Sequence, residues 1–164
     1  MTPRFEKAYN ALYNAFMNDT LAKGTCRACA VGNIVADAMG TTIEKYKNEH
    51  REFVTYECKL DNTFWSKLFF TVDGEQERGY CEEKTRKLEE LTGYSIDEMA
   101  KIEYAFETNT EIVFSDYYSA TEKEIMEDQF RGLMAVMDVM IQLDEIHEGE
   151  KYKETFKNKF AYEH

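Results

Sequence analysis

The most regular hydrophobic pattern of the chain lies in residues 119–147. Its apolar residues recur at intervals of three and four, which is the helical period. The residues that form this pattern are Ile125, Phe130, Leu133, Met134, Met137, Met140 and Ile141. Ser119 stands three residues before Glu122, and Thr121 stands three before Glu124, which is the spacing of a helix-starting capping box. Val136, Val139 and Leu143 widen the apolar face, so this segment is predicted to be a central helix with several neighbours.

Other segments show helical spacing or helix-start signals. They are 3–21, 26–39, 61–70, 75–91 and 151–160. Ser95 and Glu98 form a further capping box, and the helix that it starts carries Met99, Ile102 and Phe106 on one face. Gly40 is expected to end the second helix, because a left-handed residue commonly follows a helix.

Residues 42–60 carry two patterns. Ile43, Tyr46 and His50 follow helical spacing, whereas Val54, Tyr56, Cys58 and Leu60 alternate with polar residues, which is the period of a strand. We expect a helix here, and a short strand or hairpin is the alternative. Residues 112–114 are the β-prone run that such a strand would pair with.

These elements predict one all-α domain over residues 1–164, with six or seven helices around 119–147 and with 148–164 as a terminal helix or tail. A minor β element is left open. A chain of 164 residues with 43% hydrophobic residues can bury a core of its own.

The composition of the chain limits the kinds of molecule that the protein is expected to bind. The chain has no apolar run of membrane-spanning length and no signal-peptide pattern at its start, so we expect a cytoplasmic protein without membrane contact. A net charge of −12 argues against general nucleic-acid binding, because phosphate contacts need Lys and Arg. Residues 95–128 hold ten acidic residues and two lysines. They are interpreted either as solvated helix faces or as a surface for a protein partner with a basic surface.

Cys26 and Cys29 form the most chemically suggestive motif. If Thr25 caps the second helix, both thiols lie one turn apart at its N-terminus, where the helix dipole favours thiolate. This spacing is typical of redox dithiols and of half a zinc site, and a four-thiolate zinc site would need Cys58 and Cys81. The alternative is that the pair only packs the start of the helix, and no cofactor is predicted.

Two polar residues border apolar faces. Glu103 falls between Met99 and Phe106 on its helix, so its carboxylate is expected to be paired or to have a raised pKa. Asn33 either hydrogen-bonds a neighbouring loop or lines a pocket. With Trp65, the only tryptophan, these residues are the candidates for contact with a ligand or partner.

The stretch from Cys26 to Asn33, C-x-x-C-A-V-G-N, resembles a small family of uncharacterised bacterial proteins. The likeness extends to the aromatic–Trp65 segment, to Ile102-Glu103 before Phe106 and to 132–136, with an insertion around 36–62. Its members are often labelled as one of the components of a sodium-translocating NADH-quinone reductase. The resemblance implies that the motif cysteines, Gly32, Asn33 and Glu103 belong to one recurring arrangement. It implies no activity, because the iron–sulfur, flavin and membrane-anchor features of that reductase component are not present in this pattern.

No complete catalytic constellation is found, so no catalytic residue is predicted. The leading hypothesis is a non-enzymatic interaction or inhibitor module with an acidic face. The alternatives are a metal-binding or thiol-redox protein that uses Cys26 and Cys29, and a small-ligand binder with an interhelical pocket near Asn33 and Glu103. We also expect Cys26, Cys29, Gly32 and Glu103 to lie together where the helices meet.

Overall fold

A computed structural model of the chain describes residues 2–25, 28–41, 43–47, 54–58 and 82–163. The elements in these ranges are α1 (Pro3–Met17), α2 (Ala30–Ala38), β1 (Ile43–Lys47), β2 (Val54–Cys58), α4 (Glu82–Thr92), α5 (Ile96–Thr108), the 3₁₀ helix η1 (Phe114–Ser119), α6 (Glu122–Leu143) and α7 (Glu150–Glu163). The predicted all-α fold class is confirmed, with a short β-hairpin added.

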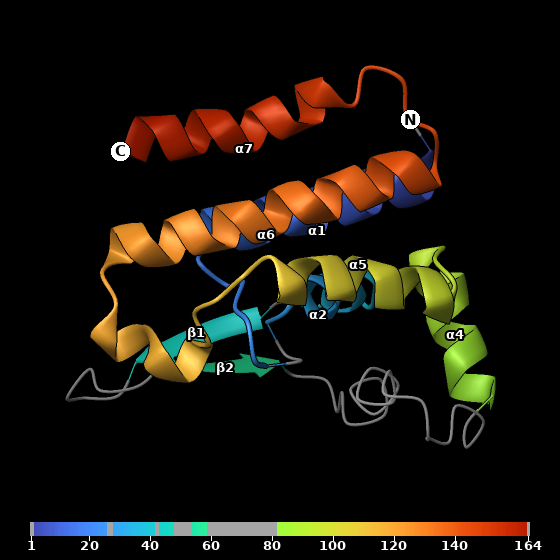
Figure 1. Ribbon diagram of the computed structural model, residues 1–164. Helices are drawn as coiled ribbons and strands as arrows, with labels where there is room; N and C mark the ends of the chain where they lie inside the picture. The colour runs from blue at the N-terminus through green and yellow to red at the C-terminus, as the bar shows by residue number, and fades with distance from the viewer. Residues whose placement is uncertain (1, 26–27, 42, 48–53, 59–81, 164) are drawn as a thin grey trace.

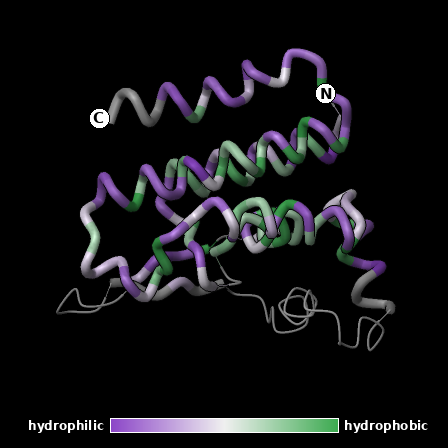
Figure 2. The backbone as a smooth tube through the Cα atoms, in the orientation of Figure 1, coloured by the Kyte–Doolittle hydropathy of each residue, from purple (hydrophilic) through white to green (hydrophobic). Residues whose placement is uncertain are grey.

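The helices form stacked layers (Figure 1). α6 lies beside α1, and this pair covers α5 and α2. α7 packs on the outer side of the first layer, α4 closes one end, and the hairpin lies near η1 at the other. Figure 2 shows hydrophobic positions gathered along α1, α2, α5 and α6, whereas α7 is mostly hydrophilic. Phe156 attaches α7 to the bundle, with its ring 5.7 Å from that of Tyr9 and 5.8 Å from that of Phe16.

The predicted central helix is present as α6. Thr121 is its N-cap, and its hydroxyl accepts from the Glu124 N–H at 3.1 Å. α6 packs against α1, α5 and α7, whereas the main contacts of α2 are with α1, α4 and α5. α6 packs closely against the end of α5 at Gly132, where an added Cβ would lie 2.5 Å from Thr110 Cγ2.

The predicted Ser95 capping box is confirmed. The Glu98 N–H donates to Ser95 Oγ at 3.1 Å, and Glu98 Oε1 accepts from the Ser95 N–H at 2.9 Å. The terminal helix is also present, as α7. The predicted helices over 61–70 and over 75–81, the start of 75–91, lie outside the described residues.

The expected helix over 42–60 is wrong, because β1 and β2 pair as an antiparallel hairpin in which Ile43 faces Cys58. Ile43 and Tyr56 are buried in a small second cluster with Tyr117 of η1, which explains why alternate positions are apolar. Residues 112–114 are not the partner strand. Val113 instead makes an isolated parallel bridge with Lys23.

The second helix starts later than predicted. Cys29, not Thr25, is the N-cap of α2, with an extended backbone at φ −70° and ψ 174°. Its Sγ accepts from the Gly32 N–H at 3.2 Å, so the thiol satisfies an amide at the helix start. Gly40 follows α2 with φ +74°, as expected for the residue that ends a helix.

Candidate functional site

Cys29 and Glu103 meet at the N-terminus of α2. Glu103 extends from α5, and its Oε2 accepts from the Val31 N–H at 3.1 Å. The Cys29 thiol also hydrogen-bonds the Glu103 carboxylate. Since Cys29 accepts from Gly32 as well, the expectation that Cys29, Gly32 and Glu103 lie together is confirmed. Cys26 lies outside the described residues.

Glu103 is a buried carboxyl group, with 9% of its surface exposed. Its pKa is raised to about 7 in all: burial raises it most, the Val31 N–H and the Cys29 thiol lower it in part, and the nearby Glu107 adds a smaller upward shift. Glu103 Oε1 accepts no hydrogen bond from the described part of the chain. The group therefore carries a proton in a large share of molecules at neutral pH.

Asn33 ties α2 to the loop that precedes it. Its Nδ2 donates to the carbonyls of Thr20 at 2.9 Å, Ala28 at 3.1 Å and Cys29 at 3.1 Å. Three carbonyl acceptors on one atom settle the orientation of the amide, because the side-chain oxygen could not take that place. The predicted hydrogen bond to a neighbouring loop is confirmed.

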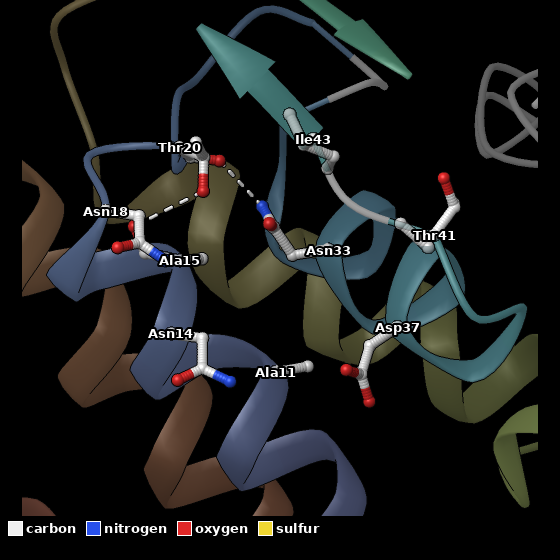
Figure 3. A pocket seen from close by; sticks show the side chains of 10 residues that line it. Ala11, Asn14, Ala15, Asn18, Thr20, Asn33, Asp37, Thr41 and Ile43 are labelled. Carbon is white, nitrogen blue, oxygen red and sulfur yellow. Dashed lines mark hydrogen bonds between the residues drawn. The ribbon is translucent and has the colours of Figure 1, made fainter. Parts of the chain in front are cut away.

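Asn33 also lines a pocket of about 160 Å³ between α1, α2 and the start of β1 (Figure 3). Glu103 does not line it, so the two residues face different surroundings. Asp37, in the last turn of α2, belongs to its wall. The pKa of Asp37 is raised by burial, and Lys7 lowers it in part.

The structure does not test a role for the other cysteines or for Trp65 at this site. Cys81 and Trp65 lie outside the described residues, and Cys58 is the last residue of β2. Within the described ranges, no three His, Cys, Asp or Glu side chains are grouped as they would be around a metal ion. The four-cysteine zinc site and the role of Trp65 stay predictions.

The acidic segment 95–128 is partly internal. Asp128 is 1% exposed, and its carboxylate accepts from the N–H groups of Glu111 at 2.7 Å and Ile112 at 3.0 Å and from Arg131 at 2.9 Å. The interpretation of this segment as a surface is therefore wrong for Asp128, and it is wrong for the buried Glu103 as well. Asp128 instead fixes the turn that leaves α5, because a carboxylate can accept from two successive amides.

The remaining carboxylates of this segment, from residue 107 onward, lie along the chain that leads from the end of α5 through η1 into α6, whose course Figure 1 shows. We call this surface the acidic end. It comprises Glu107, Glu111, Asp116, Glu122, Glu124 and Glu127, with the side chain of Tyr118 67% exposed among them. Lys123 forms an ion pair with Glu127 at 4.0 Å. Lys23 Nζ donates to the carbonyls of Glu107 at 2.8 Å and Thr110 at 2.5 Å, so it helps to hold the turn.

A polar cluster around Arg4 was missed from the sequence. Arg4 forms ion pairs with Glu98 at 2.8 Å and with Asp144, and its guanidinium lies 4.5 Å from the centre of the Tyr94 ring. These residues come from α1, α5, the end of α6 and the loop before α5. No local pattern connects positions so far apart in the chain. The cluster joins the helix ends and is separate from the α2 site.

None of the helices in the described ranges is apolar over a length that would cross a membrane. No protein-family model matches the chain, and neither the curated proteins nor the solved structures contain a significant match. The resemblance through the C-x-x-C-A-V-G-N motif therefore stays a prediction, and function has to be argued from the residues themselves.

Proposed function

We propose that the protein is a non-enzymatic binding module whose acidic end docks a protein partner with a basic surface. One observation carries the proposal: the segment from the end of α5 through η1 to the first turns of α6 holds six carboxylates that are not fully buried, together with the exposed Tyr118. Lys123 is the single Lys or Arg in residues 104–127, and it is already paired with Glu127. Lys23, which reaches the Glu107 and Thr110 carbonyls, adds a positive charge from another segment, and the carboxylates still outnumber these two lysines.

Helix stability accounts for only some of these carboxylates. Glu122 and Glu124 stand in the first turn of α6, where the helix dipole favours negative charge. Glu107 stands in the last turn of α5, which has no basic residue, and the dipole opposes a carboxylate there. Glu111 lies outside the helices. A binding role explains Glu107 and Glu111, which local stability does not.

Tyr118 adds exposed aromatic surface to the acidic end. Charged groups steer a partner and select its charge, but most of the affinity of protein interfaces comes from a few well-packed residues, often aromatic. Tyr104, 65% exposed on α5, stands one helical turn before Glu107 and extends the same kind of surface. The acidic end thus combines charge with aromatic area.

The test compares two triple variants that each remove three negative charges. The first carries Glu111→Gln, Asp116→Asn and Glu122→Gln at the acidic end. The control carries Glu90→Gln, Glu148→Gln and Glu154→Gln, which are exposed carboxylates elsewhere. Binding of a fluorescent lysine-rich peptide is measured by anisotropy at low and physiological salt.

We expect the first triple variant to weaken peptide binding by about tenfold and the control by less than about threefold. Tyr118→Ala should weaken binding without changing its salt dependence. An equal loss in the two triple variants would contradict the proposal, because net charge alone would then account for binding.

The metal or thiol-redox alternative receives weaker support. Cys29 lies at a helix N-terminus, which favours thiolate, but it is 3% exposed and its thiol faces the Glu103 carboxylate, which opposes a second negative charge. Metal content by mass spectrometry and thiol titration test it on protein purified without chelator. Stoichiometric zinc lost in the Cys26→Ala/Cys29→Ala variant would favour this alternative over the binding module.

A further inference from the structure

The pocket between α1, α2 and β1 has two kinds of wall (Figure 3). Ala11, Ala15, Ala36 and Ile43 form its apolar part. Asn14, Asn18, Asn33 and Asp37 are among its polar lining residues. Its volume of about 160 Å³ leaves room for a small chain-like group.

The polar residues that line the pocket offer several hydrogen-bond acceptors, beside the donors of the asparagine amides and threonine hydroxyls. Because Asn33 Nδ2 is occupied by three carbonyls, the group that Asn33 has left to offer a ligand is its side-chain oxygen. Asp37 can only accept when ionised, and its carboxylate interacts electrostatically with Lys7. Asn14 and Asn18 can add further oxygens.

The charged group among the described residues that line the pocket is a carboxylate. Among the described residues that line it, none is a lysine or arginine, and Asp37 is the only ionisable group. Asp37 also stands in the last turn of α2, which has no basic residue, so the helix dipole opposes its charge. Local helix stability does not explain a carboxylate at this position. Lys7 acts on it from outside the pocket lining, and a cationic ligand would add a second positive partner.

We infer that this pocket binds the ammonium group of a short alkylamine. An ammonium has three donors and no acceptor, which matches the oxygens of Asp37 and Asn33, and its alkyl chain matches the alanine wall. A lysine side chain and a free aliphatic amine share this chemistry. The pocket has no lining residue in common with the acidic end, so the inference does not depend on the proposed function.

The inference is tested by nuclear magnetic resonance on protein labelled at its alanine methyl groups, with n-butylamine as the probe. The methyl groups of Ala11, Ala15 and Ala36 line the pocket, and Ala105 on α5 is the internal control. We expect saturable shifts at the pocket alanines and none at Ala105. Neutral n-butanol should cause much smaller shifts, because it lacks the charge.

Asp37→Asn keeps the shape of the side chain and removes its charge. Asp37 is exposed enough for the variant to fold, and we expect it to weaken n-butylamine binding by about tenfold. Asp116→Asn, at the acidic end, should leave binding unchanged. Equal shifts with n-butanol, unchanged binding in Asp37→Asn, or no shift at the pocket alanines would overturn the inference.

A second comparison identifies the source of the amine. If Nα-acetyl-lysine methylamide binds more tightly than n-butylamine and 1,4-diaminobutane, the pocket accepts a lysine side chain of a protein. If the diamine binds most tightly, the pocket accepts a free amine. The acidic end can fail to bind the lysine-rich peptide while the pocket binds amines. The pocket can also fail to bind amines while the acidic end binds the peptide. The two proposals are therefore tested separately.

Discussion

The Glu103→Gln substitution replaces a buried carboxyl group by an amide. It should remove one source of pH dependence from the stability of the protein. The ordinary pKa of this carboxyl is 4.5, and in the folded protein it is raised to about 7, chiefly by burial. The folded state therefore keeps a proton that the unfolded chain loses between these two values. Its contribution to stability is fully present below pH 4.5 and is lost as the pH rises through about 7.

The size of this effect follows from the pKa difference. One pKa unit corresponds to about 1.4 kcal/mol, so a shift from 4.5 to about 7 corresponds to roughly 3 kcal/mol between acidic and alkaline conditions. The side chain is 9% exposed, so solvent screening reduces the effect little. Glutamine cannot ionise, and its side-chain oxygen can still accept from the Val31 N–H.

The assay is urea unfolding followed by circular dichroism, from about pH 5 to about pH 8, on the native protein and on Glu103→Gln. We expect the native protein to lose stability relative to the variant by roughly 2.5 kcal/mol over this range, because part of the loss already occurs below pH 5. The informative quantity is the change of the unfolding free energy with pH, since the new amide can add a constant cost at every pH. Glu90→Gln, which changes an exposed carboxyl, is the control. Parallel stability curves for the native protein and Glu103→Gln would refute the reasoning.

Three further predictions concern stability measured by urea unfolding at neutral pH. Gly132→Ala should cost about 1–3 kcal/mol, because the added Cβ would lie 2.5 Å from Thr110 Cγ2; an unchanged midpoint would mean that α5 and α6 separate freely. Asn33→Ala should cost about 1–2 kcal/mol, because the Thr20 carbonyl loses its donor while the Ala28 and Cys29 carbonyls keep backbone donors, and a neutral effect would show that water replaces the amide. Arg4→Met should cost roughly 3 kcal/mol, because Asp144, whose side chain is 3% exposed, loses its partner; Asp144→Asn in the same background should recover part of that loss.

The elements that were predicted correctly depend on short-range rules. The Ser95 capping box joins residues three apart, and the N-cap role of Thr121 rests on the same spacing. α6 was recognisable because its apolar residues repeat with the helical period over many turns. Glu103 could be singled out in the same way, since the helical period alone places it beside the apolar face of α5.

The errors occurred where distant residues decide the local structure. Ile43 and Tyr46 are spaced as in a helix, but the segment pairs with β2, and this pairing depends on a second strand and on burial against Tyr117. Thr25 looked like the cap of α2, whereas the extended backbone and bound amide at Cys29 place the start later.

What the sequence by itself determined is the helical class, the position of the central helix, the net charge and the identity of the residues with chemistry to offer. These follow from composition and from rules that act within one or two turns. Only the tertiary structure decided that Cys29 meets Glu103, that Asp128 is buried and that Asp37 and Asn33 share a pocket. The physical reason is that burial and long-range hydrogen bonds depend on which surfaces the folded helices bring together, and periodicity along a chain does not contain that information.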